Sequence, residues 1–191
     1  MSDPRNSCIH RYELCSSAIS KWSVPGKPRG LSVTRSCNLL VTCREPNKLV
    51  ELSADSGQSV REITLQSDIE CPHHCVQLTT GEHVVCHGAY GSVLHRVCVV
   101  GDDGKVIRSY GGQCGSDVGH LNWPRHLVVD NDSQFIFVAD YGNARVVLLS
   151  ATLEFVRHIE QLSWPCRLYF HQSTRRLFVG QLLGDVRVIE L

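Results

Sequence analysis

Hydrophobic positions along this chain come in short runs, and polar turn residues separate the runs. Between residues 122 and 149, for example, turn clusters at 130–133 and 140–143 separate apolar runs at 127–129, 135–138 and 145–149. The runs are too short and too rich in β-branched residues for helices. They predict antiparallel strands joined by tight turns of Asp, Asn, Gly and Ser.

The same unit recurs along the chain and begins each time at a proline. The opening residues are Pro28, Pro72, Pro124 and Pro165, which are 44, 52 and 41 residues apart. A period of about 40 to 50 residues with about four strands per repeat is typical of β-propeller blades. The sequence therefore predicts an all-β propeller of four to five blades, each a four-stranded antiparallel meander.

The prolines also set the expected boundaries. Residues 1–6 are polar and expected to be disordered, and residues 7–24 are expected to form a partial blade of two strands at 8–14 and 18–24. Further blades are expected at about 25–66, 67–111, 119–161 and 162–191, the last of them with three strands. This assignment gives 17 strands in total.

The third complete repeat carries a specific motif. Residues 124–130 read PRHLVVD and residues 135–149 read FIFVADYGNARVVLL. They resemble the NHL repeat, with Asp140, Asn143 and Arg145 at the family's positions. The copy that begins at Pro72 has lost both the aspartate and the Asn-x-Arg, and the other copies keep part of the pattern. The resemblance implies an NHL-type propeller, similar to the C-terminal domain of TRIM-NHL proteins, in which the opening prolines, Asp140 and Asn143 are structural.

NHL propellers usually close with six blades, so 17 strands leave two arrangements open. The chain is a fragment of a larger propeller, or the strand at 18–24 becomes the fourth strand of the last blade and closes a small ring. We favour the fragment, because a four-blade ring is tight and the family does not normally build one. An open arc would expose strand edges, which allows self-association.

Charge and targeting signals narrow the function classes. The chain has 19 basic and 19 acidic residues, so no strong overall field attracts it to nucleic acid or membranes. No apolar run approaches the ~20 residues of a membrane-spanning helix. No apolar segment typical of a signal peptide follows Met1, so we expect a cytoplasmic protein with reduced cysteines.

Candidate binding residues follow from the geometry of a propeller. The loops before the innermost strand and between the second and third strands of each blade share one face, and loops of this kind carry function. The basic and aromatic residues expected there are Arg29, Arg44, His73, His87, Arg125, Tyr141, Arg145 and Arg167. Such a patch suits acidic protein segments or a phosphate backbone.

Chemistry beyond binding has little support in the sequence. No nucleophile-elbow, phosphate-loop or zinc-protease motif occurs, so we predict no catalytic residue and no cofactor. Residues 71–75 read CPHHC and offer four zinc-ligand types, but alternation along a strand would point neighbours to opposite sides, so we predict no metal site there.

The resemblance implies a non-catalytic module that recognises a protein partner, as in the substrate-recruiting domains of TRIM-type ubiquitin ligases. Any ligase activity would reside in RING segments that this chain lacks. The first alternative is binding of single-stranded RNA on the basic face. The second is a propeller enzyme of the lyase or hydrolase type.

Overall fold

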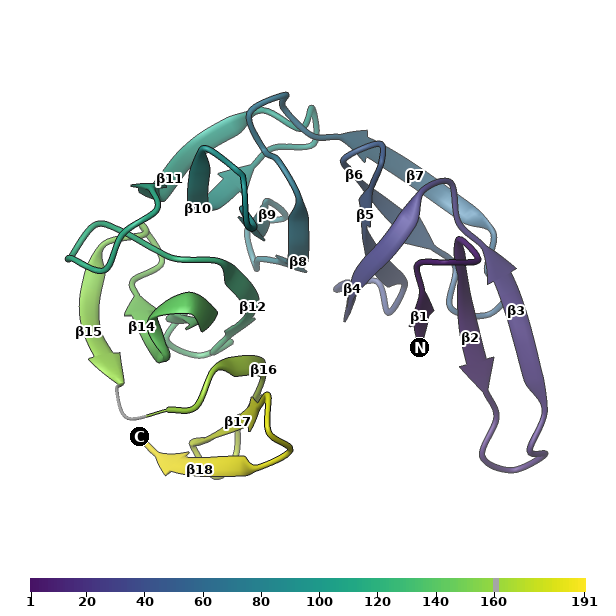
Figure 1. Cartoon of the computed structure of the whole chain (residues 1–191). Helices are drawn as coiled ribbons and strands as arrows, with labels where there is room; N and C mark the ends of the chain where they lie inside the picture. The colour runs from purple at the N-terminus through teal and green to yellow at the C-terminus, as the bar shows by residue number, and fades with distance from the viewer. Residues whose placement is uncertain (160–161) are drawn as a thin grey trace.

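The computed structural model describes residues 1–159 and 162–191 and contains five antiparallel sheets that follow one another around an arc (Figure 1). The first sheet consists of β1 (Ser2–Asp3), β2 (Cys8–Tyr12) and β3 (Ile19–Ser23). The second consists of β4 (Lys27–Val33), β5 (Leu39–Arg44), β6 (Lys48–Leu52) and β7 (Ser59–Thr64). The third consists of β8 (Pro72–Gln77), β9 (His83–His87), β10 (Leu94–Val100) and β11 (Val106–Gln113).

The fourth sheet consists of β12 (Pro124–Val129), β13 (Ile136–Asp140), β14 (Arg145–Leu149) and β15 (Phe155–Ile159), with a 3₁₀ turn, η1 (Tyr141–Asn143), between β13 and β14. The fifth consists of β16 (Pro165–His171), β17 (Arg176–Gln181) and β18 (Val186–Glu190). Sequential strands pair as neighbours in every sheet. The predicted all-β propeller of four-stranded meanders is therefore confirmed.

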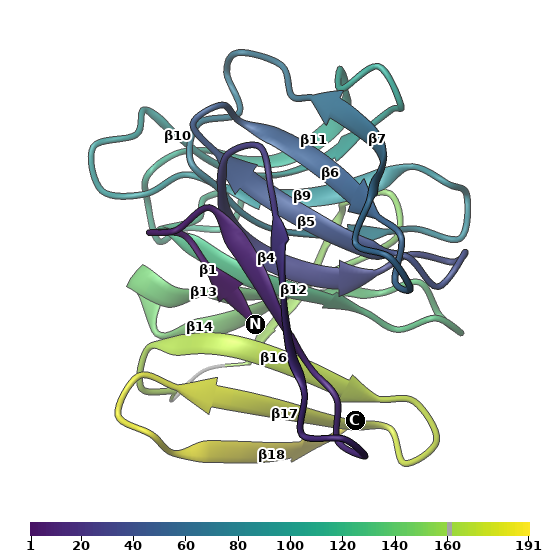
Figure 2. The same ribbon diagram turned by 90° about the vertical axis from the view of Figure 1, so that its right-hand side faces the viewer.

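The first strands of successive sheets line the concave side of the arc. Figure 1 shows β4, β8, β12 and β16 on this side, and β4 packs against β8, β8 against β12, and β12 against β16. The turned view in Figure 2 places β17 and β18 at the lower end of this arrangement. Four strands from distant parts of the sequence thus meet around one central channel.

One expectation about the ends of the chain needs correction, and the less favoured of the two open arrangements is excluded. Residues 1–6 were expected to be disordered, but β1 pairs with β2, and the Met1 ammonium donates to the His10 carbonyl at 2.7 Å. The edge of β2 offers unpaired backbone groups that β1 satisfies. The small closed ring is not adopted, because β3 pairs with β2 and, in the described part of the chain, β18 pairs with β17 alone.

The core lies between neighbouring sheets. Along β9, Val84 and Cys86 belong to the cluster shared with the fourth sheet, while Val85 belongs to the cluster shared with the second. Both faces of β9 are therefore buried, which explains why its sequence is a continuous apolar run. Burial of one such valine stabilises the fold by roughly 1.5–3 kcal/mol relative to exposure.

The cysteines take part in this packing. All ten are free thiols. Cys43, Cys86 and Cys98 are fully buried in the second and third strands of their sheets, and burial raises the pKa of each thiol to about 12. They act as small apolar side chains.

Within the described residues, no helix is long and apolar enough to cross a membrane.

Candidate functional site

A one-residue bulge follows the opening proline of each inner strand. The pairing register shifts after Pro28, Pro72, Pro124 and Pro165, while the prolines themselves are buried. A bulge leaves the extra residue outside the ladder and re-aims its side chain. The residues in this position are Arg29, His73, Arg125 and Cys166. Each blade therefore directs an equivalent side chain toward the same end of the channel.

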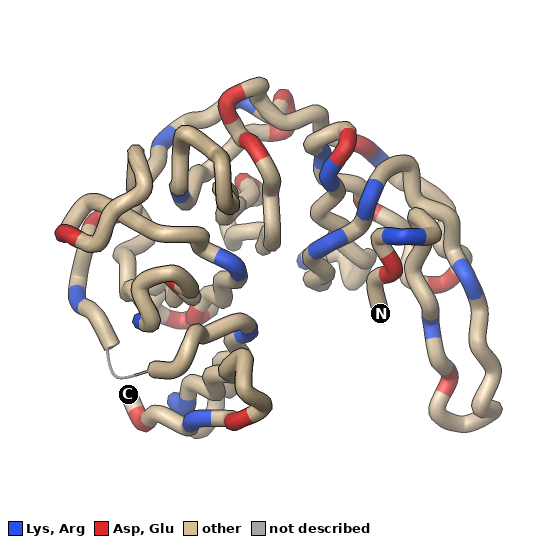
Figure 3. The backbone as a smooth tube through the Cα atoms, viewed as in Figure 1, with Lys and Arg blue, Asp and Glu red and all other residues tan. Residues whose placement is uncertain are grey.

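Four arginines gather at this end of the channel. We call Arg29, Arg44, Arg125 and Arg167 the arginine cluster. His73 reports their proximity: burial is the main cause that lowers its pKa to about 3, and all four guanidinium charges lower it further. The imidazole is therefore neutral at pH 7. Figure 3 shows the basic positions of β4, β12 and β16 on the concave side of the arc.

Aromatic rings hold one member of the cluster in place. The guanidinium carbon of Arg125 lies 4.3 Å from the centre of the Tyr141 ring and 4.9 Å from that of Trp123. These two rings meet edge to face at 5.3 Å. The Trp123 indole N–H donates to Nε2 of His73 at 3.0 Å, which fits a neutral imidazole. Arg125 is thus oriented by cation–π contacts with both rings.

The cluster is short of negative charge. In the described part of the chain, none of its four arginines takes part in an ion pair. The nearby carboxylate of Glu45 is paired with Lys27, and Arg44 donates to the Cys71 sulfur at 2.6 Å. Burial lowers the pKa of Arg29, and Arg44 lowers it further. Like charges held together in this way favour an external anion.

A cavity of about 300 Å³ lies within the cluster's end of the channel, with Arg29, His73 and Arg167 in its lining. Gly30 also lines this cavity. A Cβ at this position would lie 2.6 Å from the His73 carbonyl oxygen. No other residue allows β4 and β8 to approach so closely. A neighbouring cavity of about 410 Å³ extends outward past Arg44 to the loop of Tyr90.

Two further histidines form the wall of the smaller cavity. The rings of His74 and His126 stack with centroids 3.8 Å apart. Nε2 of His74 donates to the Leu31 carbonyl at 3.1 Å, and Nδ1 of His126 accepts from the Leu168 amide at 3.3 Å. Burial lowers the pKa of His74 to about 4 and that of His126 well below its ordinary value. Both rings are neutral and make a rigid contact between the third and fourth sheets.

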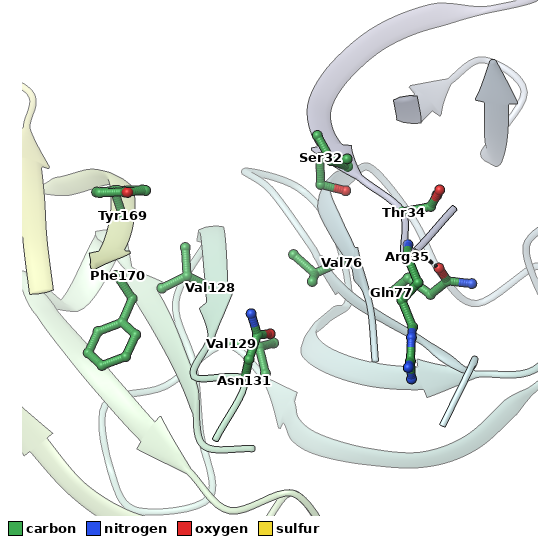
Figure 4. A pocket seen from close by; sticks show the side chains of 11 residues that line it. Ser32, Thr34, Arg35, Val76, Gln77, Val128, Val129, Asn131, Tyr169 and Phe170 are labelled. Carbon is green, nitrogen blue, oxygen red and sulfur yellow. Dashed lines mark hydrogen bonds between the residues drawn. The ribbon is translucent and has the colours of Figure 1, made fainter. Parts of the chain in front are cut away.

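The opposite end of the channel has a different character. Its cavity of about 340 Å³ is lined both by apolar side chains such as Val76, Val128 and Phe170 and by polar ones such as Arg35 and Gln77 (Figure 4). The Arg35 amide donates to Oε1 of Gln77 at 3.0 Å. The channel therefore joins a basic end to an end of mixed polar and apolar lining.

The residues of the NHL-like motif contact one another rather than the channel. Asp140 is fully buried and accepts hydrogen bonds from the Asn122 amide at 2.7 Å, from Asn143 Nδ2 at 2.8 Å and from Arg145 Nε at 2.8 Å. Arg145 also donates to the Ser116 carbonyl at 2.7 Å. Burial raises the pKa of Asp140, although these hydrogen bonds oppose the shift. The motif fastens the long connection that leads into β12.

Two of the predicted surface residues are not at the surface. Arg145 is 6% exposed because it serves the motif just described, and His87 is 0% exposed. Nε2 of His87 accepts from Arg96 at 3.2 Å, and burial lowers its pKa to about 4. Both residues lie at the end of a strand pair whose two faces are buried. Tyr141 is half-buried and contacts Arg125. The other five predicted residues are His73 and the four arginines of the cluster.

Sequence reasoning missed two residues at this end of the channel. Trp123 directly precedes an opening proline and joins His73 to Arg125. Cys166 occupies the same bulge position as Arg29, and its sulfur lies 3.9 Å from Nη1 of Arg125. The signal was present for Cys166, since it directly follows an opening proline.

The CPHHC segment does not gather metal ligands. Its histidines face different partners, Trp123 for His73 and the His126 ring for His74, and Cys75 lies in the core. In the described residues, the one group of metal-ligating side chains within reach of a common ion is elsewhere, in the first sheet.

Comparison with known proteins identifies the fold class. No family model and no curated protein sequence matches this chain. A chain in the crystal structure of a nidogen–laminin complex is similar with a TM-score of 0.80 and 17% identity, over 100% of this chain and 70% of that one. Virginiamycin B lyase from Staphylococcus aureus gives a TM-score of 0.64 at 10% identity, over 98% of this chain and 64% of the lyase.

A protein of unknown function from Bacteroides caccae is similar as well, with a TM-score of 0.66 at 12% identity over 96% of this chain and 69% of its own. The chain thus has a β-propeller fold of five sheets, and it spans 64–70% of the length of these three matched chains. At such identities the likeness concerns the fold alone. Neither named relative is described as an NHL or TRIM protein, so that finer assignment stays a prediction from the sequence.

Proposed function

We propose that this chain is a non-catalytic binding module whose arginine cluster recognises an acidic segment of a protein partner. One observation carries the proposal: four guanidinium groups from three blades converge around a neutral histidine of another blade, and none is ion-paired within the described residues. Planar guanidinium groups bind carboxylates through paired, charge-assisted hydrogen bonds. An Asp- or Glu-rich segment supplies several such groups in sequence.

The surroundings of the cluster favour a protein over a nucleic acid. Tyr90, which is 96% exposed, lines the outer cavity together with Arg44, and Trp164, which is 46% exposed, lies two residues before Cys166. Arginine and aromatic residues are enriched in protein interfaces, where lysine is depleted. The net charge of zero supplies no long-range field of the kind that dominates nucleic-acid binding.

The histidines of the channel weigh against an enzyme. A general acid or base works best with a pKa near the operating pH. Burial lowers the pKa of His73 to about 3 and that of His74 to about 4, and the four arginines add to the shift of His73. Both rings are also occupied by internal contacts. They therefore serve as structural elements of the binding site in this proposal.

The resemblance to NHL domains extends the proposal by one step. In a longer cytoplasmic protein with a RING segment, a module of this kind would present its bound partner for ubiquitination. This finer role rests on the sequence motif, whereas recognition of an acidic segment rests on the arginine cluster.

Fluorescence anisotropy with two probes tests the proposal. The first probe is a labelled decapeptide of glutamate and leucine, and the second is a labelled single-stranded RNA of mixed sequence. We expect the peptide to bind, and we expect Arg29→Glu and Arg125→Glu each to weaken it about 10- to 100-fold, because charge-assisted hydrogen bonds contribute about 1.5–3 kcal/mol. Arg187→Glu, an exposed site on β18, is the matched control and should leave the affinity within about twofold.

The outcomes separate the alternatives. Binding of RNA but not peptide, lost in the same two variants and steeply dependent on salt, would establish the RNA reading instead. Peptide binding that both glutamate variants preserve would place the site elsewhere. Circular dichroism of each variant ensures that lost binding does not reflect lost folding.

A further inference from the structure

Three side chains that can ligate a metal ion lie together in the first sheet. Asp3 pairs directly with Cys8 across β1 and β2, and His10 is two residues beyond Cys8 on the same strand. Because side chains alternate along a strand, all three point to one face. One ligand atom from each lies within 4.8 Å of the other two.

The spacing of these atoms matches a tetrahedral zinc site. The Cys8 sulfur lies 3.5 Å from Nε2 of His10, and this nitrogen lies 3.4 Å from Oδ2 of Asp3. Zinc bonds of about 2.3 Å to sulfur and about 2.0–2.2 Å to nitrogen and oxygen place neighbouring tetrahedral ligands about 3.3–3.6 Å apart. The sulfur-to-nitrogen and nitrogen-to-oxygen distances of such a site are thus already present.

The carboxylate is oriented by its own turn. Oδ1 of Asp3 accepts the backbone N–H groups of Arg5 and Asn6, each at 3.2 Å, and Oδ2 accepts from Nδ2 of Asn6 at 2.8 Å while it lies 3.4 Å from Nε2 of His10. Outer hydrogen bonds of this kind fix the direction of metal ligands.

We propose that Asp3, Cys8 and His10 bind one Zn²⁺ ion. The mixture of one thiolate, one imidazole and one carboxylate suits zinc among the common divalent ions. Cys8 is buried, while Asp3 and His10 are half-buried, so the fourth position faces solvent and takes a water molecule. On binding, the Cys8 thiol loses its proton to solvent, and the resulting thiolate forms the zinc–sulfur bond.

The ion would lock β1 onto β2. Strand β1 has two residues, and it packs against β4. The Ser2 hydroxyl donates to the Arg29 carbonyl at 3.2 Å, so the zinc site is joined to the strand that carries the arginine cluster. The zinc site does not depend on the proposed function, because its ligands are separate from the cluster.

Metal titration of the whole chain tests this inference. After removal of bound metal with a chelator, Co²⁺ is added as a spectroscopic probe and then displaced by Zn²⁺. We expect one equivalent, with the charge-transfer absorption of a cobalt–thiolate bond. Asp3→Asn, His10→Gln and Cys8→Ser should each lower the zinc affinity by at least about 10- to 100-fold, since loss of an outer-shell partner already has this effect.

A matched control uses another thiol of the same sheet. Cys15 is exposed in the turn after β2, so Cys15→Ser should keep one equivalent and the full affinity. Asp3→Asn and His10→Gln lie at half-buried positions and remain informative if Cys8→Ser fails to fold. Tight zinc binding that survives in Asp3→Asn and His10→Gln would assign the ion to other cysteines and overturn the inference, as would the absence of a one-equivalent site in the unaltered chain.

Discussion

The third and fourth sheets solve the same structural problem with different residues. In the fourth, Asp140 at the end of β13 pairs across the ladder with Arg145, and in the third, His87 at the end of β9 pairs with Arg96. Arg145 binds Asp140 directly, whereas Arg96 reaches Asp68 at 2.7 Å in the connection before β8. The acidic partner has moved from the strand to the loop.

Both arginines fasten the connection into the inner strand of their own sheet. Arg145 donates to carbonyl groups of the segment before β12, and Nη2 of Arg96 lies 3.4 Å from the Asp68 carbonyl before β8. The sequence motif appeared lost in the third repeat because a longer turn separates β9 from β10. The strand pairing shows that Arg96 occupies the position of Arg145. The arginine therefore still fastens the connection before the inner strand, although its acidic partner is Asp68 rather than a residue of the neighbouring strand.

The largest expected effect concerns the buried pair of the fourth sheet. Arg145→Ala should lower the free energy of unfolding by about 3–5 kcal/mol, because it leaves the fully buried Asp140 carboxylate without its cation. Urea denaturation gives the value. Arg157→Ala, an exposed arginine on β15 of the same sheet, is the control and should change stability by less than about 0.5 kcal/mol. Equal effects of the two variants would contradict the assignment.

The second largest effect concerns how the free energy of unfolding depends on pH through the third and fourth sheets. Burial lowers the pKa of His87 from 6.5 to about 4, so the unfolded chain binds its proton first. This histidine's contribution is complete above pH 6.5 and declines as the pH falls toward 4, by about 3 kcal/mol at most. His87→Gln should reduce the slope of stability against pH in this range by up to one proton.

Asp140 occupies the same ladder position with the opposite sign. Because its pKa is raised on folding, its contribution is present below the unfolded pKa and is lost as the pH rises through the folded pKa. Urea denaturation at several pH values measures both trends. An unchanged slope between pH 4 and 6.5 in His87→Gln would show that other buried histidines carry the acid sensitivity.

The smallest effect is expected for the pair of the third sheet. Arg96→Ala should lower the free energy of unfolding by about 1 kcal/mol, because the Asp68 side chain is 36% exposed and hydrates when its partner is removed. The ratio of this value to that of Arg145→Ala, from the same urea experiments, measures how strongly burial sets the two pairs apart. A loss as large as that of Arg145→Ala would mean that Asp68 is effectively buried.

Part of the candidate site was visible in the sequence. The opening prolines placed Arg29, His73 and Arg125 at equivalent positions, because each follows a proline and the repeat sets their blade register. His87 could not be assigned correctly, because residues at the end of a strand are exposed or buried according to the neighbouring sheets. The pairing of Asp3 with Cys8 was likewise hidden in a segment too short and polar to predict as a strand.

The sequence by itself determined the strands other than β1, the turns and a count of four to five blades. Short β-branched runs, turn residues and the recurring proline are local signals, and each depends on interactions within one repeat. The tertiary structure decided which side chains meet. Arg29, Arg125 and Arg167, each more than 40 residues from the next, lie around His73 because the inner strands that carry them pack side by side. Such convergence follows from the curvature of the whole arc, which no single repeat encodes.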